Sequence, residues 1–139
     1  MKLNSMFARI AVLLGSIVWT VAAAGQDVGL ESTWLAEDIK NGGVIDDLQT
    51  TLTIGPDNQA SGNGGCNGFG GAYTLEGDKL TFGDLASTMM ACAPAIMDQE
   101  RKFFDALAEV RTWRLNDGTG ILYLGNDQGA DILRFSRTD

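Results

Sequence analysis

The chain contains no histidine, so any chemistry has to come from carboxylates, lysine, tyrosine or cysteine. Without histidine, neither a Ser-His-Asp triad, a Cys-His pair nor the common zinc sites can form. The carboxylate of Glu100 stands out because it falls at the centre of an otherwise apolar helical stripe. The two cysteines, Cys66 and Cys92, are the other reactive side chains. These residues make no recognisable catalytic constellation, and we expect a protein that is not an enzyme and holds no cofactor or metal.

Glu100 has two interpretations. A carboxylate at the centre of an apolar helix face is costly to bury unless it is hydrogen-bonded or paired. One interpretation is a general acid in a buried site, where catalytic carboxylates are often found. The structural interpretation, which we favour, is that Glu100 accepts hydrogen bonds from backbone N–H groups of a glycine-rich loop and fixes that loop in place.

That loop runs from Gly62 to Tyr73 and reads Gly-Asn-Gly-Gly-Cys-Asn-Gly-Phe-Gly-Gly-Ala-Tyr. Glycine-dense runs occur where the backbone needs positive φ or has to approach another group closely. Consecutive N–H groups can also cradle a phosphate, but this run lacks the Gly-Lys-Ser/Thr of a P-loop and a βαβ setting. We therefore predict a strained connection between strands that positions Cys66.

Cys66 and Cys92 are 26 positions apart, and two cysteines in an exported chain are expected to form a disulfide. Chain-entropy reasoning gives such a bond about 3–4 kcal/mol. Two alternatives stay open: two reduced, buried cysteines, or a soft Cu(I) site that includes nearby methionines. Those methionines are Met89, Met90 and Met97. Methionine at this density is more often core filler.

The first 24 residues have the pattern of a secretory signal peptide. Lys2 and Arg9 precede an apolar run over residues 10–21, and Ala22-Ala23-Ala24 supplies the cleavage site. The run is short for a spanning helix, which needs about 20 residues, so we expect membrane contact only through an uncleaved signal peptide. No cysteine directly follows the cleavage site, so a lipid anchor is not indicated. We expect a periplasmic or secreted protein.

Residues 25–139 are enough for a single domain with one core. Without Lys2 and Arg9 they carry 8 basic and 18 acidic residues, a net charge of −10. Such a surface repels phosphate backbones, so nucleic-acid binding is disfavoured. We expect the domain to be a monomer.

Alternating polar and apolar residues predict short antiparallel strands on both sides of one helix. Strands are expected over residues 33–39, 50–54, 59–62, 72–75, 79–82, 85–92, 112–115, 121–124 and 131–135. The helix is expected over about 96–110, with Pro94 in its first turn. Its apolar stripe consists of Ile96, Met97, Phe103, Phe104, Leu107 and Val110. This order predicts a β-rich α+β fold, a curved antiparallel sheet or partly open β-barrel with one packed helix.

With these residues laid out, the chain resembles the META domain, the family that includes the heat-shock protein HslJ. The resemblance covers about residues 30–135. Its motifs are Trp34-Leu35, the Gly-Cys-Asn-x-Phe-x-Gly-x-Tyr pattern of Gly65, Cys66, Asn67, Phe69, Gly71 and Tyr73, and Thr88-x-Met-Ala-Cys followed by Glu100. We expect a structural role for these motif residues. The resemblance implies a small β-rich fold with a helix on the sheet, frequent export to the bacterial envelope and a link to stress tolerance.

We expect a non-catalytic envelope protein that acts as a stress-related binding or protective module on an unknown envelope partner. One alternative is a carrier of a small apolar ligand held between helix and sheet. The side chains that would line such a site are Trp34, Phe69, Tyr73, Phe103 and Phe104. A core of this size is normally filled by such aromatic residues themselves. Another alternative is an inhibitor of a secreted enzyme, acting through the glycine-rich run or residues 40–47.

Overall fold

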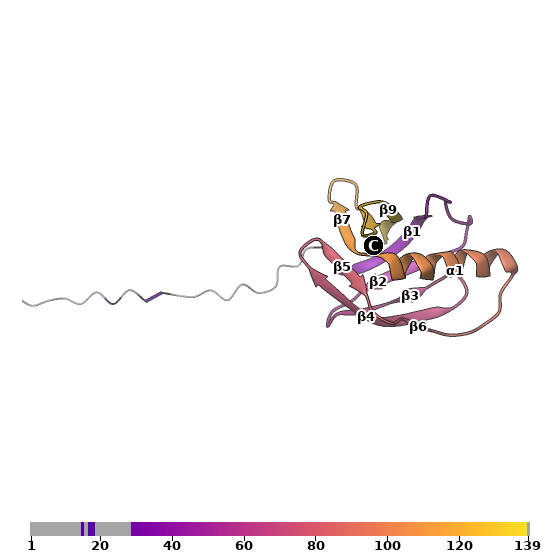
Figure 1. The fold of residues 1–139 in the computed structure, drawn as a ribbon, viewed down its shortest axis with the longest axis horizontal. Helices are drawn as coiled ribbons and strands as arrows, with labels where there is room; N and C mark the ends of the chain where they lie inside the picture. Colours follow the sequence, from indigo (N-terminus) through magenta and orange to yellow (C-terminus); the bar gives the residue numbers. More distant parts are fainter. Residues whose placement is uncertain (1–14, 16, 19–28, 139) are drawn as a thin grey trace, which may run out of the picture.

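The computed structural model describes residues 15, 17–18 and 29–138 (Figure 1). The rest of the expected signal peptide and its cleavage site lie outside the described residues. The strands are β1 (Ser32–Ile39), β2 (Thr51–Ile54), β3 (Gln59–Asn63), β4 (Gly68–Glu76), β5 (Lys79–Phe82), β6 (Ala86–Ser87), β7 (Thr112–Asn116), β8 (Ile121–Gly125) and β9 (Asp131–Thr138). The helix α1 (Pro94–Glu109) lies between β6 and β7 in the chain.

The strands form an antiparallel sheet that closes on itself (Figure 1). Its order is β3-β2-β1-β9-β8-β7-β5-β4, and β4 pairs back with β3, which makes a closed barrel. Outside this ring, β6 adds to β4 through two residue pairs. The seam between β5 and β7 holds a single pair, Lys79 with Thr112. The prediction of a β-rich α+β fold with one packed helix is confirmed, and the barrel is closed rather than partly open.

The interior of the barrel is a packed core shared by strands and helix. Leu52 and Ile54 alternate with partly exposed threonines along β2, the pattern of a strand with one face inside a barrel. Trp34 of β1 is fully buried, as are Phe103 and Leu107 of α1. Burying one such side chain contributes roughly 1.5–3 kcal/mol. These contacts fix the helix against the sheet.

The helix begins two residues before the expected position and ends one residue before it. No helix in residues 29–138 is long and apolar enough to cross a membrane. The expected apolar stripe is wrong at its N-terminal end, where Gln99 and Glu100 are buried while Ile96 and Met97 are only partly covered. Hydrogen bonds inside the fold compensate for burying these two polar side chains.

The glycine-rich run is mostly strand, and its prediction as a connection is wrong outside residues 64–67. β3 extends to Asn63 and β4 begins at Gly68. A Cβ on Gly62 would collide with the Thr51 carbonyl oxygen, and one on Gly71 would lie 2.8 Å from the Asp84 carbonyl oxygen. Glycine at these positions therefore allows neighbouring backbone segments to approach closely.

The strand expected over residues 85–92 is also wrong for most of its length. Ladder pairing is confined to Ala86–Ser87, and residues 88–93 have no regular structure. In this segment the backbone of Met90 bonds to the side chain of Asn67 in place of a neighbouring strand.

Candidate functional site

Residues 64–67 form a tight turn between β3 and β4. The Gly64 N–H donates to the Asn67 carbonyl oxygen at 2.9 Å, and the Gly65 N–H donates to Oδ1 of Asn63 at 2.7 Å. Gly65 has a φ of 123°, which side chains rarely adopt. A Cβ on Gly64 would lie 2.7 Å from Cγ of Glu100. The turn therefore needs glycine at both positions, at one for its conformation and at the other for close contact with the helix.

Glu100 lies against this turn with 3% of its surface exposed. Its Oε2 accepts hydrogen bonds from the backbone N–H groups of Cys66 at 2.8 Å and Asn67 at 2.6 Å. Its Oε1 accepts from the Asn67 side-chain amide at 2.6 Å. Hydrogen bonds to a charged acceptor are roughly twice as strong as neutral ones. The carboxylate thus holds the turn to the helix, which is the contact that the structural interpretation predicted.

Asn67 extends this contact to the segment before the helix. Its Oδ1 accepts from Oγ1 of Thr88 at 2.9 Å and from the N–H of Met90 at 2.6 Å. Its Nδ2 donates to the Met90 carbonyl oxygen at 3.2 Å as well as to Glu100. Because one side chain bonds both backbone groups of Met90, it replaces a neighbouring strand and fixes residues 88–90.

A disulfide closes the same junction. Cys66 and Cys92 are bonded with their Cα atoms 6.1 Å apart, within the range that a disulfide requires. The predicted disulfide is confirmed, and neither sulfur is a free thiolate for the alternative Cu(I) site. Among the described residues, no group of three or more His, Cys, Asp or Glu side chains could hold a metal ion. The bond is consistent with an extracellular protein.

A second buried polar chain, from the helix to the residue before β2 and on to the glycine turn, was not predicted. Oε1 of Gln99 accepts from the Ile45 N–H at 2.7 Å, and its Nε2 donates to Oγ1 of Thr50 at 3.2 Å. That hydroxyl donates in turn to the Gly64 carbonyl oxygen at 3.1 Å. Every buried polar side-chain atom in the part of the chain that the structure describes has a partner. The one available signal was the position of Gln99 next to Glu100 in the sequence.

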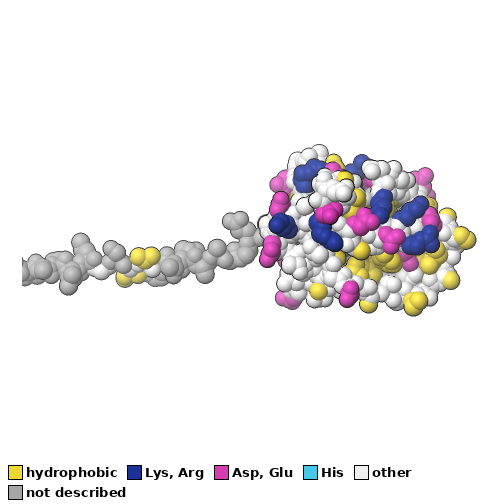
Figure 2. All heavy atoms as spheres, in the orientation of Figure 1, with side chains coloured by type: hydrophobic (Ala, Val, Ile, Leu, Met, Phe, Trp, Pro, Cys, Tyr) yellow, Lys and Arg dark blue, Asp and Glu magenta, His cyan; other side chains and the backbone are white. Residues whose placement is uncertain are grey.

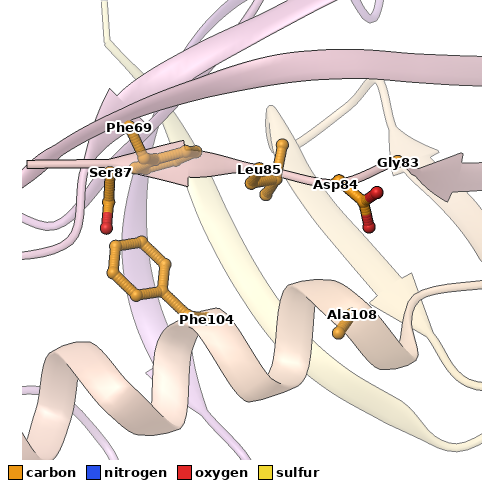
Figure 3. A pocket seen from close by; sticks show the side chains of 7 residues that line it. All are labelled: Phe69, Gly83, Asp84, Leu85, Ser87, Phe104 and Ala108. Atoms are coloured by element: carbon orange, nitrogen blue, oxygen red, sulfur yellow. The ribbon is translucent and has the colours of Figure 1, made fainter.

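A groove runs between α1 and the segment of residues 83–90. It consists of two adjoining pockets of about 230 and 480 Å³ that share Ser87 and Phe104. The first, seen in Figure 3, is lined by Phe69, Gly83, Asp84, Leu85, Ser87, Phe104 and Ala108. The second is lined by Asn67, Ser87, Thr88, Met89, Met90, Met97, Glu100, Arg101, Phe104 and Asp105. We call the two together the α1–β6 groove.

The walls of the α1–β6 groove combine apolar side chains with polar and charged ones. On the helix side, Arg101, Phe104 and Ala108 are spaced by three and four residues, which places them on one face. On the other side, Met89 is 96% exposed and Met90 is 56% exposed. Figure 2 shows hydrophobic side chains in the strip between α1 and the strands β4 and β6, with charged side chains along the outer face of the helix.

The five aromatic residues expected to line a ligand site separate into two groups. Trp34 and Phe103 are fully buried in the core, and Tyr73 is buried in the sheet. Phe69 and Phe104 line the α1–β6 groove, with their rings edge to face and centroids 5.3 Å apart. The structure therefore brings two of the five to an open pocket.

The family comparison gives a match over nearly the whole chain. The model of the META domain family matches residues 26–139. No curated protein matches the chain significantly.

Solved structures share the fold. An NMR structure of a protein from Burkholderia xenovorans has a TM-score of 0.65 and 28% identity, covering 78% of this chain and 82% of that one. A crystal structure of a DUF4847 family protein from Bacteroides vulgatus has a TM-score of 0.58 at 14% identity, covering 81% of this chain and 97% of that one, and shows a likeness of fold alone. Because the family match spans the barrel, the helix and the junction between them, the chain belongs to the META domain family.

Proposed function

We propose that the protein is an exported, non-catalytic binding module and that the α1–β6 groove is its binding site. The observation that carries the proposal is an open groove that exposes Met89 and Met90 beside Phe104 on a strongly acidic domain. Exposed apolar surface of this kind marks interaction sites on soluble proteins. Small-molecule sites typically measure about 300–1,000 Å³, a range that includes the larger of the two pockets. Methionine suits such a surface because its flexible thioether adapts to different ligands.

The junction around Glu100 supports a non-catalytic function. Its carboxylate accepts three hydrogen bonds from the turn, and both cysteines are bonded to each other. The most reactive side chains of the sequence are therefore engaged in holding the fold. The disulfide and the expected signal peptide together support export.

The same junction gives the groove a fixed outer wall. Asn67 holds Met90, the Thr88 hydroxyl bonds Asn67, and Cys92 ties the end of the segment to Cys66. Residues 88–93 pair with no strand, so these contacts, together with the bond from the Thr88 N–H to the Gly68 carbonyl oxygen, hold the wall in place. We therefore assign to the Gly-Cys-Asn turn the task of positioning the groove, which pre-organises it for binding.

A ligand in the groove is a different arrangement from the carrier considered above, whose ligand lies between helix and sheet. Trp34, Phe103 and Phe135 already fill that space, with the rings of Phe103 and Phe135 edge to face at 6.3 Å. Interiors are packed to the density of organic crystals and leave little room for a guest. We therefore place the ligand on the outer side of Phe104.

Titration with N-phenyl-1-naphthylamine, a neutral apolar fluorophore, tests the proposal. We expect a saturable rise in fluorescence that the double substitution Met89→Ser and Met90→Ser weakens roughly 5- to 30-fold, because apolar contact area is lost. Both side chains are exposed, so the barrel should stay intact, which unfolding curves would verify. Ile45→Ser is the matched control, since Ile45 is a 37% exposed apolar residue in a separate pocket. Equal binding by the double variant and the wild type would reject the groove as the site.

A further inference from the structure

We infer that the α1–β6 groove selects a small amphipathic cation, a molecule with an apolar body and one ammonium-type group. The inference rests on the proposed function of the groove and adds the charge of its ligand. It follows from the charged side chains that line the groove, their partners, and their position around Phe104.

Three carboxylates and one guanidinium line the groove: Asp84, Glu100, Asp105 and Arg101. Arg101 is one helical turn before Asp105 but forms its ion pair with Asp98, at 2.6 Å, outside the groove. Within residues 29–138, neither Asp84 nor Asp105 has an ion pair. Both carboxylates are on exposed residues and are free to meet a ligand. The lining therefore combines apolar side chains with unneutralised negative charge.

The two free carboxylates lie on opposite walls. Asp84 belongs to the strand side, and Figure 3 shows its carboxylate directed toward α1 near Ala108. Asp105 belongs to the helix side and follows Phe104 in sequence. A bound molecule in contact with the Phe104 ring would thus have a carboxylate within its reach on either wall. The face of an aromatic ring also attracts cations.

Charge and size together exclude other ligand classes. An anion would meet the two free carboxylates, Asp84 and Asp105, on a domain whose net charge over residues 25–139 is −10. A neutral apolar molecule would fill the pockets without using either free carboxylate. The larger pocket, of about 480 Å³, has the size of a small-molecule site, whereas a standard protein interface covers about 800 Å² on each partner.

Three ligands with the same ten-carbon tail test the inference: decyltrimethylammonium, decyl maltoside and decyl sulfate. Each displaces N-phenyl-1-naphthylamine from the full protein at concentrations below micelle formation. We expect the cation to bind best and the anion worst, with the cation's advantage shrinking as salt screens the charges. The double substitution Asp84→Asn and Asp105→Asn should weaken binding of the cation roughly three- to tenfold, as expected for exposed ion pairs, and leave the neutral ligand unchanged. Asp117→Asn removes one charge from a turn outside the groove and should change nothing.

The outcomes distinguish selection of a cation from binding in the groove as such. If cation and neutral ligand bind equally, or if the double Asn variant keeps the preference, cation selection is wrong while the groove remains a binding site. If neither the fluorophore nor any of the three ligands binds, the proposed function fails and the inference fails with it.

Discussion

Nδ2 of Asn67 lies 2.6 Å from Oε1 of Glu100, deep in the junction between the glycine turn and the helix. Through this contact a helix residue and a turn residue 33 positions apart share one buried hydrogen-bond network. Asn67 then holds Met90, so the network ends at the outer wall of the groove. This contact therefore connects the glycine-rich run to the surface that we propose for binding.

Replacing Glu100 tests the strength of the junction. We expect Glu100→Gln to lower the free energy of unfolding by about 1–3 kcal/mol, because one acceptor becomes a donor facing another donor. Glu100→Ala should cost more, about 2–5 kcal/mol, since the turn N–H groups lose their partner and a cavity remains. Urea unfolding curves measure both. Glu109→Gln makes the same change in an exposed ion pair with Lys40 and should shift stability by no more than about 1 kcal/mol. A Glu100→Gln variant as stable as this control would show that the contact is dispensable.

Asn67→Asp places a second carboxylate beside Glu100. Two carboxylates in one buried site raise the pKa of one of them, so the folded variant favours a shared proton. At neutral pH the variant should have a free energy of unfolding about 2–4 kcal/mol below that of the wild type. This difference should shrink as the pH falls below the raised folded-state pKa. Urea unfolding at neutral and mildly acidic pH measures this recovery. Asn63→Asp is the control in the same turn, because an exposed carboxylate there can still accept from the Gly65 N–H. A penalty independent of pH would rule out the close approach of the two groups.

The disulfide should contribute stability mainly through the unfolded chain. Reduction of the disulfide, or the double substitution Cys66→Ala and Cys92→Ala, opens the loop between two residues 26 positions apart. Either change should lower the free energy of unfolding by about 3–4 kcal/mol. Unfolding curves with and without reductant measure the loss. Reductant should leave the double variant unchanged, which separates the bond from other effects of the reagent. A difference below about 1 kcal/mol would contradict the estimate.

Tyr73 predicts an alkaline limit to stability. Burial is the main cause that raises the pKa of its hydroxyl above 10.0, and the charge of Glu31 adds to it. The folded state therefore favours the protonated form, so this contribution is complete below the unfolded pKa of about 10 and is lost as the pH rises through the folded value. The hydroxyl also donates to the Gly55 carbonyl oxygen at 2.7 Å. Tyr73→Phe should cost about 0.5–1.5 kcal/mol near neutral pH and lose less stability than the wild type at alkaline pH. A parallel alkaline loss in both proteins would exclude this role of Tyr73.

The strands were predictable where side chains alternate. Leu52 and Ile54 of β2 point inward between threonines, and that period of two is visible in the sequence. The start of β4 has no such signal, because Gly68, Gly70 and Gly71 carry no side chain. It becomes a strand through pairing with β3, where glycine permits the close approach. Barrel closure likewise depends on contacts between distant strands.

Within the site, Glu100 was predictable because an acid in an apolar stripe needs a partner inside the fold. Met90 was not, since its apolar neighbours predict a strand while its backbone bonds to Asn67, 23 positions earlier. Gln99 was missed because its partner Thr50 lies 49 positions away and gives no local signal. The groove itself arises only when α1 packs beside β6, which no periodicity in either segment predicts.

The most direct test of the groove as the binding site is an NMR titration of the ¹⁵N-labelled protein with N-phenyl-1-naphthylamine. We predict saturable shifts of the amide signals of Ser87, Met90 and Phe104, which line the groove from both walls. Signals of Gly43 and Ile45, in the pocket formed with Gln99 and Lys102, should stay in place. Shifts confined to that second pocket, or no saturable shifts at all, would show that the groove is not the binding site.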